Sequence, residues 1–73
     1  MTQTVTIRRV WPPSTGDPGR HVFTVIVRHA LDEVVLWTRD RALAAEAERL
    51  AEPPRAELAV RWSASHQLLE MRP

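Results

Sequence analysis

The hydrophobic period of this chain changes twice, and these changes constrain the fold more than any other feature. Up to about Thr38 the apolar residues follow strand-like patterns, mostly with the period of two of half-buried strands. From there to Glu52 they recur with the helical period of 3.6, and Pro53 and Pro54 forbid continuation of that helix. Alternation then returns over 55–62. Strands, one helix and further strands define an α+β domain.

Three strands are expected before the helix. They cover 2–11 (TQTVTIRRVW), 21–30 (HVFTVIVRHA) and 34–38 (VVLWT). The segment 12–19 is rich in proline and glycine and is predicted to be a long, mobile loop that folding does not require. The break at 31–33 is short, which predicts a tight hairpin between the second and third strands.

The helix is expected over 39–52, with Thr38 as its N-cap and Asp40 in its first turn. Its apolar stripe predicts that Leu43, Ala47 and Leu50 are buried against the sheet. A fourth strand over 55–62 follows. Residues 63–73 fit a short strand, a helical turn or a tail, and we expect the strand. The predicted architecture is a two-layer α+β sandwich: an antiparallel sheet of four or five strands with one helix on one face.

Length and composition set the broad class. At 73 residues the chain is expected to form one domain over 1–73, and 44% hydrophobic with 26% charged residues is a globular balance. It contains no cysteine, so it has no disulfide framework and no thiolate site. No apolar run approaches the roughly 20 residues of a membrane span, and we expect a cytoplasmic protein without membrane contact.

The polar residues do not form a recognisable catalytic or metal motif. His21 and His29 lie eight residues apart on one predicted strand, roughly 26 Å, and cannot share an ion. Ser63, Ser65 and His66 are sequence neighbours but do not lie in a nucleophile elbow. We therefore predict a protein that is not an enzyme and that uses no metal and no cofactor.

Tryptophan and arginine are the unusual residues of this chain. All ten basic residues are arginine, and three tryptophans lie beside arginines in Arg8-Arg9-Val10-Trp11, Trp37-Thr38-Arg39 and Arg61-Trp62. GC-rich codon usage accounts for an arginine excess, and small cores use tryptophan as filler. We expect Trp62 to lie in the core, and Trp11 with it. Both residue types are nevertheless enriched in binding hot spots.

The strand phases suggest where a binding patch lies. If Phe23, Val25 and Val27 face the helix, Ile26 and Arg28 point to the opposite side of the sheet; the reverse choice of face stays open. On the first choice, the predicted partner-binding residues are Arg8, Ile26, Arg28, Trp37 and Arg61.

Two functions fit an apolar patch with arginines around it. The first is a non-enzymatic protein that binds and covers a surface of a protein or ribonucleoprotein partner, or of a second copy of itself. Domains of this size without catalytic residues are frequent among phage and mobile-element inhibitors of host nucleic-acid machinery, including anti-CRISPR proteins. The alternative is a small DNA-binding or RNA-binding domain that uses its open sheet face. The salt dependence of binding separates the two.

Overall fold

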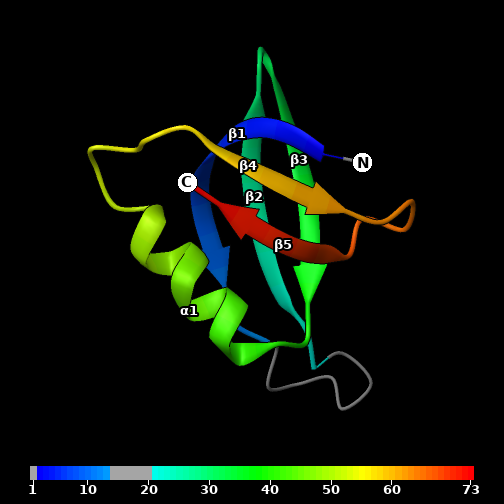
Figure 1. Cartoon of the computed structure of the whole chain (residues 1–73). Coiled ribbons are helices and arrows are strands. Elements are labelled where there is room, and N and C mark those ends of the chain that lie inside the picture. Colours follow the sequence, from blue (N-terminus) through cyan, green and yellow to red (C-terminus); the bar gives the residue numbers. More distant parts are fainter. Residues whose placement is uncertain (1, 14–20) are drawn as a thin grey trace.

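The computed structural model describes residues 2–13 and 21–73 (Figure 1). Its elements are β1 (Thr2–Trp11), β2 (Phe23–His29), β3 (Asp32–Thr38), α1 (Arg41–Leu50), β4 (Leu58–Trp62) and β5 (Leu68–Arg72). The predicted α+β domain, with an antiparallel sheet and one helix in this order, is confirmed, and the C-terminal segment forms the fifth strand. The loop 12–19 was predicted to be mobile, and its residues from 14 on lie outside the described part of the chain.

The long strand β1 organises the sheet, whose order is β3-β2-β1-β4-β5. The first part of β1, Thr2 to Val5, pairs with β4, and the remainder, from Thr6 on, pairs with β2. A β-bulge between Ile7 and Arg9 interrupts the register with β2. Because a bulge bends its strand and increases the local twist, β1 can pass from one half of the sheet to the other.

The two edge strands of this curved sheet meet. Trp37 of β3 and Gln67, next to β5, form a parallel bridge, and the Trp37 backbone N–H donates to the His66 carbonyl oxygen at 3.0 Å. The strands therefore follow each other around a closed path, β1-β2-β3-β5-β4 and back to β1. This connectivity, with a helix between the third and fourth strands, is that of the OB-fold, a partly open barrel of five strands.

The core lies inside this barrel. It is an almost wholly aliphatic cluster to which all five strands and α1 contribute: Val5, Ile7, Val25, Val27, Leu36, Ala47, Leu58, Val60, Trp62 and Leu68. The predicted core position of Trp62 is confirmed, since its side chain is 5% exposed. The core side of β2 is also the one predicted, because Val25 and Val27 are fully buried.

The helix begins later and ends earlier than predicted. Asp40, not Thr38, is the N-cap: its carboxylate accepts hydrogen bonds from backbone N–H groups of the first turn, at 2.8 Å from Ala42. Thr38 is buried instead, and its hydroxyl accepts from the Asp40 backbone N–H. Ala47 is fully buried as predicted, whereas Leu50 is half-buried. Small residues on the inner side of α1 therefore let it approach the barrel closely.

Candidate functional site

Three rows of side chains cross β1, β2 and β3 on the side turned away from the core. The alternate residues of these strands, such as Val25 and Leu36, are fully buried, which fixes the direction of the rows. In register the rows are Trp11–Thr24–Trp37, Arg9–Ile26–Val35 and Thr6–Arg28–Glu33. We name these nine residues the outer face.

The first row presents two tryptophans with Thr24 between them. Since neighbouring strands are about 4.8 Å apart, the backbones of Trp11 and Trp37 lie about 10 Å apart. The Arg9 guanidinium lies 5.9 Å from the ring centre of Trp11, and that of Arg39 lies 5.4 Å from Trp37. These are cation–π distances, so each ring carries a positive charge beside it.

Trp37 is held in place by the turn between β4 and β5. Its indole N–H donates to the Ser65 carbonyl oxygen at 2.9 Å, and its backbone N–H donates to His66. The His66 ring also contacts β3, because its Nδ1 lies 3.2 Å from the Val35 carbonyl oxygen. The indole is therefore oriented by the β4–β5 turn before any ligand binds, which lowers the entropic cost of using it for binding.

The structure brings three of the five predicted site residues together. Ile26, Arg28 and Trp37 all belong to the outer face, but Ile26, which was expected to be exposed there, is buried at 6% exposed. Arg8 does not: it falls in the β-bulge, is half-buried, and Arg9 takes the position opposite Ile26. Arg61 lies on β4, opposite Thr2 at the start of β1, and is not one of the nine outer-face residues.

The bulge also explains why the placement of Trp11 in the core is wrong. It shifts the phase of β1, so Trp11 points outward and is 51% exposed. The bulge thus accounts for the absence of Arg9 and Trp11 from the predicted site. Val35 is also absent from it, although it shares the phase of Trp37 on β3. One signal was available: the spacings Arg9-x-Trp11 and Trp37-x-Arg39 place each pair on one face of a strand. The position of the bulge had no such signal, because no glycine marks it.

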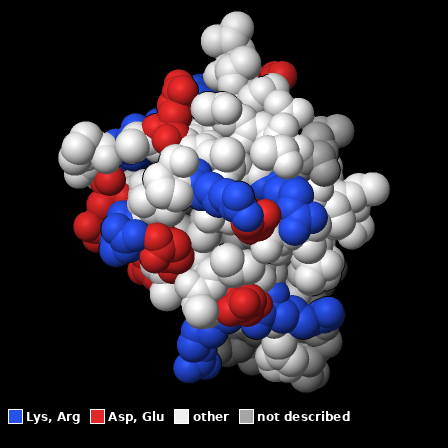
Figure 2. Space-filling model, in the orientation of Figure 1, with Lys and Arg blue, Asp and Glu red and all other residues white. Residues whose placement is uncertain are grey.

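Arg61 belongs to a separate ionic cluster on β4 and β5. Its Nε donates to Glu70 at 3.2 Å, and Arg72 donates to the other oxygen of the same carboxylate. These two hydrogen bonds, that of Arg72 first, lower the pKa of Glu70 below its usual 4.5. Figure 2 shows this side of the molecule, where an acidic group lies between two basic ones.

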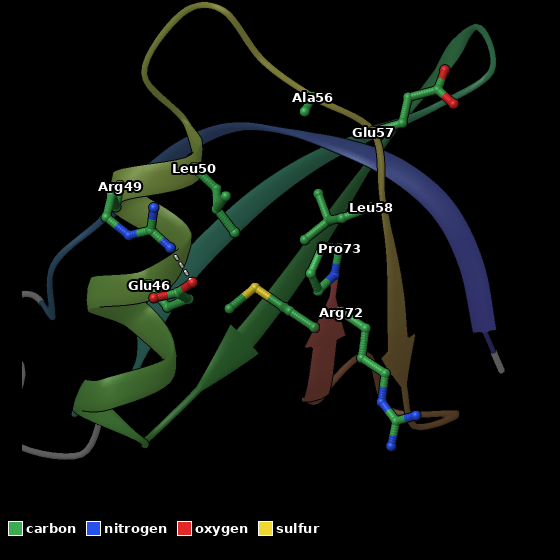
Figure 3. Close-up of a pocket in the computed structure, with 9 residues that line it drawn as sticks. Glu46, Arg49, Leu50, Ala56, Glu57, Leu58, Arg72 and Pro73 are labelled. Carbon is green, nitrogen blue, oxygen red and sulfur yellow. Dashed lines mark hydrogen bonds and ion pairs between the residues drawn. The ribbon is translucent and has the colours of Figure 1, made fainter.

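A groove between α1 and the C-terminal strand is the third surface feature (Figure 3). Its floor is aliphatic, with Leu50, Leu58 and Met71, and the ion pair Glu46–Arg49 lies on its helical side. Neither a tryptophan nor a histidine lines it. The groove thus offers apolar contact but fewer polar anchors than the outer face.

The described part of the chain was also searched for metal sites and for membrane-spanning helices. Residues 2–13 and 21–73 contain no group of three or more metal-ligating side chains. Within the same residues, no helix has the length and apolar character needed to cross a membrane. Comparisons with protein-family models, with curated proteins and with solved structures found no match for this chain. The outer face is therefore interpreted from its own residues.

Proposed function

We propose that this domain binds single-stranded nucleic acid on its outer face. The observation that carries the proposal is the row Trp11–Thr24–Trp37, in which two rings with arginines beside them lie on one exposed surface. Sequence-tolerant binding of single strands combines aromatic rings that stack on bases with cations that follow the phosphates. Both components are present here, because Arg9 of the next row and Arg39, which follows β3, lie beside the two rings.

The connectivity of the barrel supports the same proposal. In the OB-fold the face formed by the second and third strands, with the adjoining loops, binds oligonucleotides and oligosaccharides. The outer face includes those two strands, and the turn that anchors Trp37 is the loop between the fourth and fifth. Arg9 and Arg39 favour the charged ligand, because a neutral sugar chain has no phosphate for them to neutralise.

The charges along the face indicate which part of it does the binding. The acidic side chains Asp32 and Glu33 lie towards the tip of the β2–β3 hairpin. The tryptophans, with Arg9 and Arg39, lie at the opposite end of the strands. A phosphate backbone is therefore attracted to the tryptophan row and repelled at the hairpin tip.

Fluorescence anisotropy with a labelled oligothymidine tests this proposal. Trp37→Ala removes one stacking ring and should weaken binding by about 1 to 3 kcal/mol. The affinity of the wild type should fall as the salt concentration rises. A plot of log affinity against log salt concentration should have a slope of about −0.7 for each phosphate contacted. Arg49→Glu, on the exposed side of α1, is the control and should have little effect. Absence of binding at low salt, or binding that Trp37→Ala leaves intact, would overturn the proposal.

A protein partner is the second candidate. Val35, which is 54% exposed, lies at the centre of the outer face beside Ile26, which is buried at 6% exposed. Arg9 and Arg28 lie on the same face, and an apolar centre with arginines around it is the composition of a protein interface. An inhibitor of host nucleic-acid machinery of the anti-CRISPR kind, or a homodimer, would use the face in this way. Such binding should change little between low and moderate salt. Light scattering at rising protein concentration tests the homodimer, which Trp37→Ala should dissociate.

A further inference from the structure

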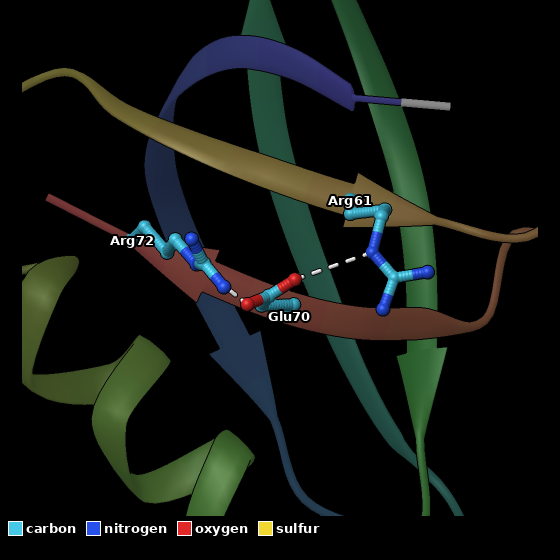
Figure 4. Close-up of polar contacts among 3 residues, drawn as sticks. All are labelled: Arg61, Glu70 and Arg72. Atoms are coloured by element: carbon cyan, nitrogen blue, oxygen red, sulfur yellow. Dashed lines mark hydrogen bonds and ion pairs between the residues drawn. The ribbon is translucent and has the colours of Figure 1, made fainter.

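The cluster of Arg61, Glu70 and Arg72 on β4 and β5 is the strongest charged feature outside the outer face. Glu70 accepts from Nε of both arginines, at 3.2 Å from Arg61 and 2.6 Å from Arg72 (Figure 4). All three side chains are at least one third exposed. The cluster carries two guanidinium charges against one carboxylate, so a net positive charge faces solvent.

The contacts with Glu70 leave both arginines able to bind something else. Each uses its Nε atom for Glu70, and the terminal nitrogens of Arg61 point away from the carboxylate (Figure 4). A guanidinium has five N–H donors, so one hydrogen bond does not exhaust it. Thr2 and Ala59 complete a shallow hollow around the cluster.

The closure of the barrel places this cluster next to the tryptophan row. Trp37 is bridged to Gln67, and Glu70 follows three residues later along β5, about 10 Å further. Arg61 is the register partner of Glu70 on the next strand, about 5 Å beyond. A ligand that leaves the outer face at Trp37 therefore needs only a short path across the β3–β5 junction to reach both arginines.

We propose that the single strand bound on the outer face continues across this junction onto β4 and β5. There Arg61 and Arg72 contact its phosphates, and Glu70 weakens that contact because its carboxylate repels the same phosphates. This inference rests on the proposed function. It extends the binding path beyond the β1–β3 surface and makes Glu70 a residue that limits affinity.

Binding of two oligothymidines tests the extension. A short one, about 4 nucleotides, covers the tryptophan row, and a long one, about 12 nucleotides, can reach both surfaces. Arg61→Gln and Arg72→Gln should each weaken binding of the long oligonucleotide alone and reduce its salt slope by about 0.7. Glu70→Gln should strengthen binding of the long oligonucleotide by about 4-fold, since a unit charge about 5 Å away contributes roughly 0.8 kcal/mol in water.

The helix supplies a matched control, because Glu48 is an exposed glutamate of α1 that does not line the groove shared by Glu46, Arg49 and Arg72. Glu48→Gln changes the net charge as Glu70→Gln does and should leave the affinity nearly unchanged. If the two variants behave alike and Arg61→Gln has no effect, the extension is wrong. In that case binding of the short oligonucleotide that depends on Trp37 still supports the proposed function. If the wild type binds neither oligonucleotide, both proposals fail.

Discussion

The indole N–H of Trp37 donates a 2.9 Å hydrogen bond to the carbonyl oxygen of Ser65, 28 residues further along the chain. This bond fastens the turn between β4 and β5 to the edge of β3, close to the bridge between Trp37 and Gln67. One side chain thus closes the barrel and presents a ring on the outer face. Under the proposed function, Trp37 therefore contributes both to stability and to ligand binding.

Trp37→Phe separates the two roles. The variant keeps an aromatic ring but loses the indole donor, so unfolding in urea should show a loss of about 1 kcal/mol. Trp11→Phe is the control, because Trp11 is a half-exposed ring at the other end of the same row, and it should cost less than about 0.5 kcal/mol. Equal effects of the two substitutions would show that the bond to Ser65 does not stabilise the closure.

The N-cap of α1 gives a second prediction. Asp40 Oδ1 accepts from the backbone N–H groups of Ala42 at 2.8 Å and Leu43 at 3.3 Å. Asp40→Ala should therefore destabilise the domain by about 1 kcal/mol in thermal or urea unfolding. Asp32→Ala, an exposed aspartate at the start of β3, should change stability by less than about 0.5 kcal/mol. A larger loss of stability for Asp32→Ala than for Asp40→Ala would show that Asp40 is not the N-cap.

The tip of the β2–β3 hairpin contains a residue in an unfavourable conformation. Ala30 has a φ of 56°, in the left-handed region that costs a residue with a Cβ about 1 kcal/mol. Ala30→Gly should consequently raise the melting temperature. Leu31→Gly at the neighbouring position, which lacks this positive φ, should leave it unchanged or lower it. A lower melting temperature for Ala30→Gly would contradict the assigned turn geometry.

Glu70 predicts how stability depends on pH. Its hydrogen bonds with Arg72 and Arg61 lower its pKa in the folded state below 4.5, so ionised Glu70 stabilises the fold above the unfolded-state pKa. This contribution is lost as the pH falls through the folded-state pKa. Unfolding of the wild type and Glu70→Gln between pH 6 and pH 3 should therefore show a stability difference that shrinks with acidification. A difference that is constant or grows would be inconsistent with the ion pairs.

The order of the elements could be predicted because it depends on local patterns. The alternation in β1, the change of period near Thr38 and the stop at Pro53 are each visible in a short window of sequence. The N-cap was misplaced by two residues because Thr38 and Asp40 are both good caps, and tertiary burial of Thr38 decides between them.

The candidate site was only partly predictable, because it depends on two non-local features. The bulge in β1 replaces Arg8 by Arg9 on the outer face, and only pairing with β2 reveals it. The meeting of β3 with Gln67 curves the sheet into a barrel, in which Arg61 is paired with Glu70 on β5 while Arg28 is paired with Thr6 on β1. Period-two reasoning treats the sheet as flat and joins residues that the barrel separates.

The most direct test of the central claim is a nuclear magnetic resonance titration of the ¹⁵N-labelled domain with an oligothymidine of about 8 nucleotides. We expect the largest shift changes at the indole N–H groups of Trp11 and Trp37 and at the amides of Arg9, Ile26 and Val35. Amides on the solvent side of α1, such as that of Arg49, should stay in place. Shift changes confined to the groove beside α1, or none at low salt, would contradict the assignment of the outer face as a nucleic-acid interface.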